Sequence, residues 1–273
     1  MNYLAIHLKE RFPILGQDGR DPVLHAYVSV GHAQEGHEEE LLRAVVICPG
    51  GGYAYCSRRE WEPVAYQFLA RGYHAFVLEY STAPHHFPAQ LQEVAAALET
   101  IHAQAAAWRC DAGKITLMGF SAGGHLAAQY ANAYDLPQVR QAVPDSKGVA
   151  ASILCYPVIS AQSGQSHPGS FLNLTGSETP DPHLFSCQEL VTGRTPPTFL
   201  WHTAEDQSVP VVNSLLYAQA LTEHHVPFEL HVFPVGPHGL STATPFTNHG
   251  LPPEVLRNSM WMDLLAQWLE MTL

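Results

Sequence analysis

A serine stands between two glycines at residues 119–123, where the sequence reads Gly-Phe-Ser-Ala-Gly. The apolar residues 115–118 before it predict a strand, and the small residues 124–130 after it predict a helix. In so tight a turn a Cβ beside the serine would collide with the flanking elements, so glycines fit there and the serine itself is strained. The helix N-terminus favours negative charge that develops at the serine hydroxyl. The pattern predicts a nucleophile at Ser121, although a Gly-rich turn without chemistry has the same letters.

A serine nucleophile needs a base to take its proton and an acid to orient that base. Asp206 follows the predicted strand 198–203, and His238 follows the predicted strand 228–233 within a Gly/Pro-rich loop. Taken singly, Asp206 is equally well explained as a helix cap and His238 as a loop histidine. Three residues at three strand ends, in the order Ser, Asp, His, together predict a catalytic triad.

The neighbouring residues offer rivals for two of these roles. Glu205 is the alternative acid, but Asp206 is preferred because it stands three residues before Val209-Pro210. His231 lies within one predicted strand and His202 within or at the end of another, so both suit a base less well than His238.

A glycine run follows the predicted strand Ala44–Cys48 and precedes Tyr53. Negative charge on a tetrahedral intermediate requires preorganised N–H donors, and glycine leaves its backbone N–H open to a substrate. We therefore expect Gly51 and Gly52 to form an oxyanion hole with Ala122, the residue after the nucleophile. A plain glycine turn is the alternative.

Strand-like and helix-like segments alternate after residue 40, which predicts an α/β fold: a mostly parallel central sheet with helices on both faces. We expect one domain over residues 1–273. The first two predicted strands, Val23–Val30 and Ala44–Cys48, are joined by a polar connector over 31–40 and are expected to pair as an antiparallel edge. Residues 160–197 interrupt the alternation and are predicted to form a small cap-like insertion. The other segments that fit strands or helices are 60–71, 74–79, 91–102, 150–155, 211–224 and a C-terminal helix from Trp261.

Composition excludes several other classes of function. The 273 residues carry a net charge of −12, which argues against nucleic acid or an anionic membrane as a partner. Five scattered cysteines form no disulfide framework, and the 17 histidines show no zinc-binding spacing, so we expect no metal. No segment of the sequence resembles a signal peptide or a membrane span, so a cytoplasmic location is expected.

The motifs together resemble those of α/β-hydrolase serine esterases, most closely the acetyl-xylan-esterase-like group related to hormone-sensitive lipase. The resemblance covers residue 43 to the C-terminus and rests on 48–53, 83–89, 119–127, 202–210 and 236–239. Two positions depart from that pattern. Pro49 replaces a usual histidine, which leaves the N–H donors of Gly51 and Gly52 intact, and Ser81 replaces a frequent arginine, which questions an ion pair there.

The resemblance implies a serine carboxylesterase that hydrolyses short acyl esters, chiefly acetyl esters, of sugars or small alcohols through an acyl-enzyme, without a cofactor. Tyr53, Phe171, Leu240 and Phe246 are predicted to line its substrate pocket. The alternatives are a serine peptidase of the acylaminoacyl type and a catalytically silent hydrolase-fold binding protein. The absence of propeller-like repeats disfavours the peptidase, and the complete triad disfavours the silent protein.

Overall fold

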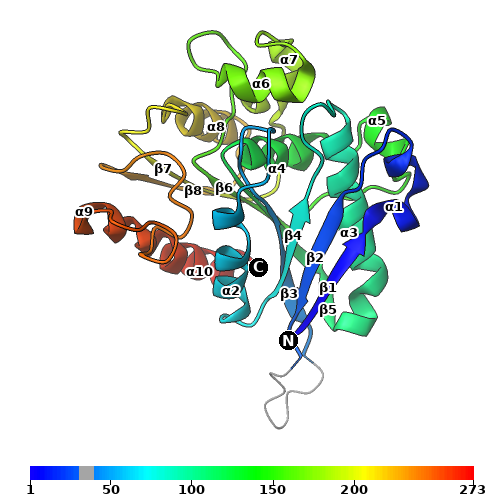
Figure 1. Ribbon diagram of the computed structural model, residues 1–273. Coiled ribbons are helices and arrows are strands. Elements are labelled where there is room, and N and C mark those ends of the chain that lie inside the picture. The colour runs from blue at the N-terminus through cyan, green and yellow to red at the C-terminus, as the bar shows by residue number, and fades with distance from the viewer. Residues whose placement is uncertain (31–39) are drawn as a thin grey trace.

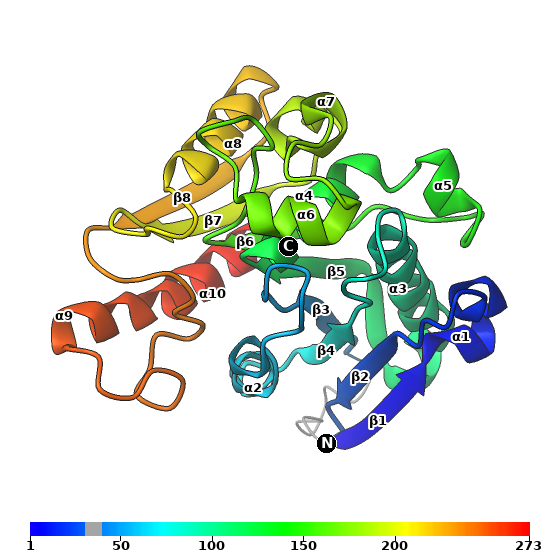
Figure 2. The ribbon, with the colours of Figure 1, turned by 45° about the horizontal axis from the view of Figure 1, so that its top comes forward.

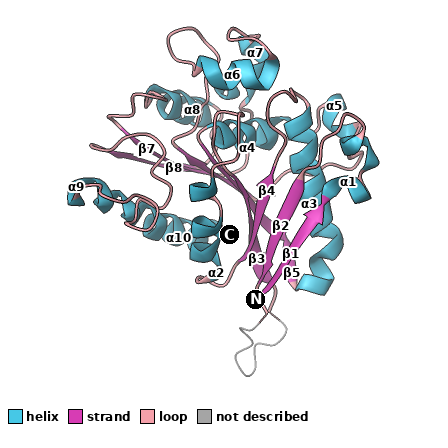
Figure 3. Ribbon diagram, viewed as in Figure 1, coloured by secondary structure: helices cyan, strands magenta, loops and turns pink. Residues whose placement is uncertain are grey.

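The computed structural model describes residues 1–30 and 40–273, so nearly all of the connector predicted at 31–40 lies outside the described residues. Within these residues one eight-stranded sheet has the order β1-β2-β4-β3-β5-β6-β7-β8. The strands from β4 to β8 pair in parallel, which confirms the predicted mostly parallel sheet. Helices pack on both of its faces (Figures 1 and 3).

The strands are β1 (Asn2–His7), β2 (Val23–Val28), β3 (Leu42–Cys48), β4 (His74–Glu79), β5 (Cys110–Phe120), β6 (Ala151–Cys155), β7 (Thr198–Thr203) and β8 (Phe228–Phe233). The α-helices are α1 (Leu8–Arg11), α2 (Glu62–Leu69), α3 (Ala89–Trp108), α4 (Ala122–Ala133), α5 (Pro137–Arg140), α6 (Pro168–Thr175), α7 (Pro182–Phe185), α8 (Val212–Glu223), α9 (Pro253–Leu256) and α10 (Trp261–Thr272). Short 3-10 helices are η1 (Pro13–Gly16), η2 (Arg58–Glu60), η3 (Cys187–Leu190) and η4 (Arg257–Met260).

Two apolar cores sandwich the sheet because successive side chains of a strand point to opposite faces. In β3, Val46 belongs to the core covered by α3, α4 and α8. Its neighbours Val45 and Ile47 belong to the core covered by α2 and α10. This double coverage explains why the central strands read as continuous apolar runs in the sequence.

The predicted antiparallel edge is wrong in its partners. β2 does not pair with β3; it pairs antiparallel with β1 on one side and with β4 on the other. The chain crosses from β3 through α2 to β4, which places β4 between the two strands expected to pair. β1 escaped prediction because the side chains of Asn2–Ala5 are exposed, so the segment has no alternating apolar pattern.

Ser81 is the second position that departs from the expected pattern, and a basic residue from elsewhere in the chain lies near it. The Ser81 N–H donates to Glu93 Oε2 at 2.7 Å, and Arg20 Nη1 lies 3.5 Å from Glu93 Oε1. Both Arg20 and Glu93 are buried. The cation beside Glu93 is therefore Arg20, which comes from the segment before β2.

The carboxyl ends of the parallel strands meet at one edge of the sheet, and residues 160–197 lie over that edge. This segment contains α6, α7 and η3, and Figures 1 and 2 show α6 and α7 above the ends of β5 and β6. None of the helices in the described parts of the chain is long and apolar enough to cross a membrane.

Candidate active site

Ser121 occupies the sharp turn between β5 and α4. Its backbone angles are φ 55° and ψ −118°, a conformation that costs energy for a residue with a Cβ. A Cβ added to Gly119 would lie 2.0 Å from Gly123 O, and one added to Gly123 would lie 2.2 Å from Cys48 O. The two glycines are therefore sterically required, and the Ser121 side chain is carried at the N-terminus of α4.

His238 joins Ser121 to Asp206 across the carboxyl edge of the sheet. His238 Nε2 lies 2.8 Å from Ser121 Oγ, and His238 Nδ1 lies 2.5 Å from Asp206 Oδ2. These distances fit a hydrogen-bond chain in which Nδ1–H donates to the carboxylate and Nε2 accepts from the serine hydroxyl. The structure thus brings together the three residues that the sequence singles out.

Three groups besides His238 contact the Asp206 carboxylate. Oδ1 accepts from the N–H groups of Ser208 and Val209, each at 2.9 Å, and Oδ2 lies 3.3 Å from His202 Nε2. Burial by itself raises the pKa of Asp206, but hydrogen bonds with His202 and His238 and the adjacent imidazole charge outweigh it. Its pKa therefore lies well below the ordinary value, and the carboxylate is ionised at neutral pH.

The rival residues occupy other places. The exposed Glu205 accepts a hydrogen bond from the Gly236 N–H at 3.3 Å rather than one from His238. His231 pairs with Glu229 at 2.6 Å. His202 is buried below Asp206, where its Nε2 lies 2.9 Å from Val209 O, so it braces the turn that carries the acid.

The glycine run passes beside the nucleophile in an unusual backbone conformation. Gly51, Gly52 and Tyr53 have φ values of 124°, 63° and 57°. A Cβ added to Gly50 would lie 3.0 Å from Ser121 Cβ, so this loop touches the serine. Within 1–30 and 40–273, the backbone N–H groups of Gly51, Gly52 and Ala122 have no hydrogen-bond acceptor. They have the chemistry that an oxyanion hole requires.

The residues predicted to line the pocket differ in their exposure to solvent. Tyr53, Phe171 and Leu240 are at most 1% exposed and belong to the two apolar cores. Phe246 is 70% exposed on the surface. The first three are therefore core side chains in this structure.

A buried histidine with no role predicted from the sequence links the glycine loop to the insertion. The Tyr53 hydroxyl donates to His125 Nδ1 at 2.9 Å, and His125 Nε2 donates to Phe185 O at 2.9 Å. Burial lowers the pKa of His125 to about 4, so it is neutral near pH 7. The signal in the sequence that could have indicated His125 was its position on α4, two residues after Gly123.

The insertion also brings His167 toward the triad. His167 precedes α6, and its Nδ1 accepts from the Ser170 N–H at 3.2 Å. Burial lowers its pKa, the charge of His238 lowers it further, and Asp206 raises it. His167 is therefore within electrostatic reach of His238 and Asp206.

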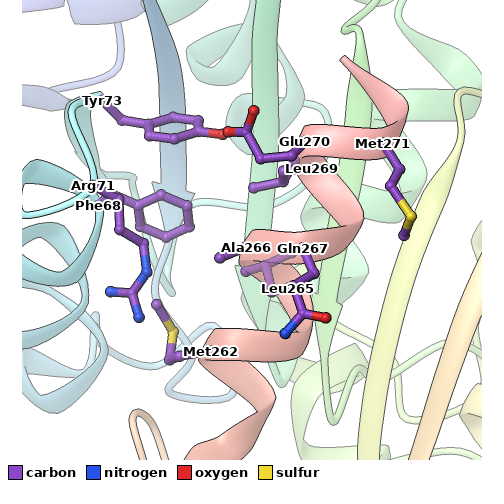
Figure 4. A pocket seen from close by; sticks show the side chains of 10 residues that line it. All are labelled: Phe68, Arg71, Tyr73, Met262, Leu265, Ala266, Gln267, Leu269, Glu270 and Met271. Carbon is purple, nitrogen blue, oxygen red and sulfur yellow. The ribbon is translucent and has the colours of Figure 1, made fainter.

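A separate hollow lies between α2 and α10. It encloses about 580 Å³ and is lined mainly by apolar side chains, among them Phe68, Met262 and Leu269 (Figure 4). It contains none of the residues predicted for the site. Among the residues that the structure describes, no three His, Cys, Asp or Glu side chains are grouped to hold a metal.

The sheet order, the serine turn and the Ser–His–Asp chain define an α/β hydrolase. The chain belongs to the BD-FAE family, whose model matches residues 32–221. It is 31% identical over 214 residues to an acetylxylan esterase from Xylanibacter ruminicola, an alignment that covers 76% of this chain.

Two solved structures resemble it over nearly their whole length. The acetyl ester-xyloside bifunctional hydrolase of Caldicellulosiruptor lactoaceticus is 35% identical with a TM-score of 0.83, covering 98% of this chain and 95% of that one. Carboxylesterase Cest-2923 of Lactobacillus plantarum is 32% identical with a TM-score of 0.84, covering 99% and 97%. The kinship is with carboxylic ester hydrolases. The chain spans 34% and 43% of the length of the curated relatives it matches.

Proposed function

We propose that this protein is a serine carboxylesterase that removes short acyl groups, chiefly acetyl, from sugars or other small alcohols. The observation that carries the proposal is the hydrogen-bond chain from Ser121 Oγ through His238 to Asp206, at 2.8 and 2.5 Å. The named relatives, an acetylxylan esterase and an acetyl ester-xyloside hydrolase, support acetyl esters as the substrate class.

The reaction follows from the roles of these groups. Ser121 Oγ attacks the ester carbonyl carbon while His238 Nε2 takes its proton, and Asp206 stabilises the resulting imidazolium. The N–H groups of Gly51, Gly52 and Ala122 bind the oxyanion of the tetrahedral intermediate. His238 then protonates the leaving alcohol, and water activated by the same histidine releases the acid from the acyl-enzyme.

Residues 160–197 act in this proposal as a cap of the single domain, and they shape the space for the acyl and alcohol groups. Their position over the strand ends supports this role (Figure 2), as does the hydrogen bond that Asn173 Nδ2 donates to Gly52 O at 2.8 Å. The substrate is a small ester, and nothing in the mechanism needs a cofactor. The cytoplasmic location stays a prediction.

The experiment that tests the proposal replaces the nucleophile. We expect Ser121→Ala to lower kcat on p-nitrophenyl acetate by about 10⁴-fold or more, because the acyl-enzyme can no longer form. Ser163→Ala, an exposed serine of the insertion, is the matched control and should retain full activity. Wild-type turnover by Ser121→Ala would contradict the proposal, and rates that rise from acetyl through butyryl to octanoyl esters would contradict its short-acyl part.

Two further measurements separate the alternatives. A fluorophosphonate should label the wild-type protein at Ser121, whereas a folded protein that does not label would be a binding protein. Faster cleavage of an acetyl-alanine anilide than of the matching ester would indicate a peptidase.

A further inference from the structure

Glu60 is a buried carboxylate at the site that takes no part in the proposed triad. It is 3% exposed and lies in the short helix η2, just after the glycine loop. Its Oε2 accepts from the Gly50 N–H at 2.8 Å, and its Oε1 accepts from the Tyr156 hydroxyl at 2.6 Å. Burying a carboxylate costs free energy unless it is well paired, so both hydrogen bonds matter to its presence.

Tyr156 extends this connection to the loop that carries the base. Its hydroxyl donates to Glu60 and accepts from the Ser241 N–H at 2.8 Å. Its ring packs edge-on against the His238 imidazole, with centroids 5.0 Å apart. Through three hydrogen bonds in series, from Gly50 to Glu60, Tyr156 and Ser241, the loop after β3 is therefore connected with the loop after β8.

The glycine loop has little room between Glu60 and the nucleophile. A Cβ added to Gly50 would lie 2.7 Å from Glu60 Oε2, 2.9 Å from Phe120 O and 3.0 Å from Ser121 Cβ. Gly51 and Gly52 continue directly from this fixed point and present their unpaired N–H groups. A shift of Gly50 would therefore move the expected oxyanion donors relative to Ser121.

We propose that Glu60 is a positioning residue that fixes the oxyanion loop through Gly50 and the His238 loop through Tyr156. The proposal rests on the proposed esterase function. Its effect is on the transition state, because the donors need accurate placement only when the oxyanion forms.

Graded substitutions at Glu60 test this. Glu60→Gln keeps one acceptor for its two donors, and Glu60→Met keeps the side-chain length but neither acceptor. We expect kcat on p-nitrophenyl acetate to fall about 10-fold for Glu60→Gln and about 100-fold for Glu60→Met, less than or near the loss of one oxyanion donor. KM should change less than about threefold, because ground-state binding does not use the oxyanion donors.

The second readout is the affinity for an aryl trifluoromethyl ketone, which forms a tetrahedral adduct with the serine. It should weaken in the same order as kcat, while a fluorophosphonate still labels every active site. A purely structural role would lower the labelled fraction and leave the kinetics of the labelled fraction unchanged, which would overturn the proposal. If Glu60→Met does not fold, Glu60→Gln and Tyr156→Phe decide the question.

Glu62→Gln is the matched control, since Glu62 is exposed two residues away and accepts its hydrogen bond from the Tyr27 hydroxyl. Ketone affinity and kcat of Glu60→Gln and Tyr156→Phe within about twofold of this control would also overturn the proposal. A wild-type protein that neither hydrolyses esters nor labels would instead contradict the esterase function itself.

Discussion

Asp206 has four polar partners, and only His238 among them touches the nucleophile. The Ser208 and Val209 N–H groups both donate to Oδ1, so this position requires a hydrogen-bond acceptor. Replacing Asp206 by asparagine would keep the carbonyl oxygen toward those two donors. The amide NH₂ would then face His238 Nδ1 and would favour the tautomer that carries its proton on Nε2.

We therefore expect Asp206→Asn to lower kcat by about 10³–10⁴-fold, because His238 in that tautomer cannot accept the Ser121 proton. The measurement is steady-state hydrolysis of p-nitrophenyl acetate at pH 7.5. Glu205→Gln, next in the chain and exposed, should stay within about twofold of wild type. An asparagine variant within tenfold of wild type would show that Asp206 is not the orienting acid.

The residues at this scale differ in how far the sequence could indicate them. Ser121, Asp206 and His238 could be predicted because each follows its own strand and their order fits one arrangement. Glu60 could not, since its role depends on Tyr156 and Ser241, which lie far along the chain. Tyr53, Phe171 and Leu240 were expected in the pocket because apolar side chains occur both in pocket walls and in cores. The residue type alone does not distinguish the two.

At the scale of elements, the serine turn depends on how closely β3 approaches α4. A Cβ on Gly123 would lie 2.2 Å from Cys48 O and 2.3 Å from Pro49 O, both of them backbone atoms at the end of β3. Backbone at the end of a central strand cannot yield without disturbing the sheet and the glycine loop together.

Gly123→Ala should therefore destabilise the fold by about 3 kcal/mol or more and abolish esterase activity. Urea unfolding followed by tryptophan fluorescence measures the first effect, and ester hydrolysis the second. Gly193→Ala is the control, because nothing lies within 4 Å of a Cβ there. Equal unfolding midpoints for the two variants would contradict the close approach.

Most strands could be predicted from the sequence, whereas their order in the sheet could not. The predicted bounds of β4 and β7 agree with the structure because buried, largely apolar runs mark them, and those of β8 agree although this edge strand is partly exposed. β5 begins at Cys110 rather than Ile115, since its first half is polar and only partly buried. The pairing of β2 with β4 depends on the crossover through α2, which no local pattern records.

At the scale of the whole molecule, two buried ionisable groups, Glu93 on α3 and His125 on α4, respond to pH in opposite directions. Burial raises the pKa of Glu93 from 4.5 to about 7, although hydrogen bonds from Ser81 and the charge of Arg20 oppose this. Burial lowers the pKa of His125 from 6.5 to about 4, although its hydrogen bond to Phe185 opposes this. The two groups therefore change the free energy of unfolding over overlapping pH ranges.

The signs follow from which state binds more protons. Between pH 4.5 and about 7, unfolded Glu93 loses its proton while folded Glu93 keeps it, so this group lowers stability as pH rises. Between pH 6.5 and about 4, unfolded His125 gains a proton that the folded protein excludes, so this group lowers stability as pH falls. Each effect is on the order of 3 kcal/mol.

Because the two contributions oppose each other, single substitutions should tilt the stability profile in opposite directions. Between pH 4.5 and 6.5, Glu93→Gln should make the free energy of unfolding rise more steeply with pH than in wild type. His125→Gln should make it rise less steeply or fall, whatever its effect on absolute stability.

Urea unfolding at half-unit pH steps measures both slopes, and contributions of Asp206, Glu60 and the other titrating groups cancel in the difference from wild type. Glu99→Gln, on the same helix as Glu93 but partly exposed, controls for the loss of a carboxylate. Parallel profiles for wild type, Glu93→Gln and His125→Gln would show that neither group holds its altered protonation state in the folded protein.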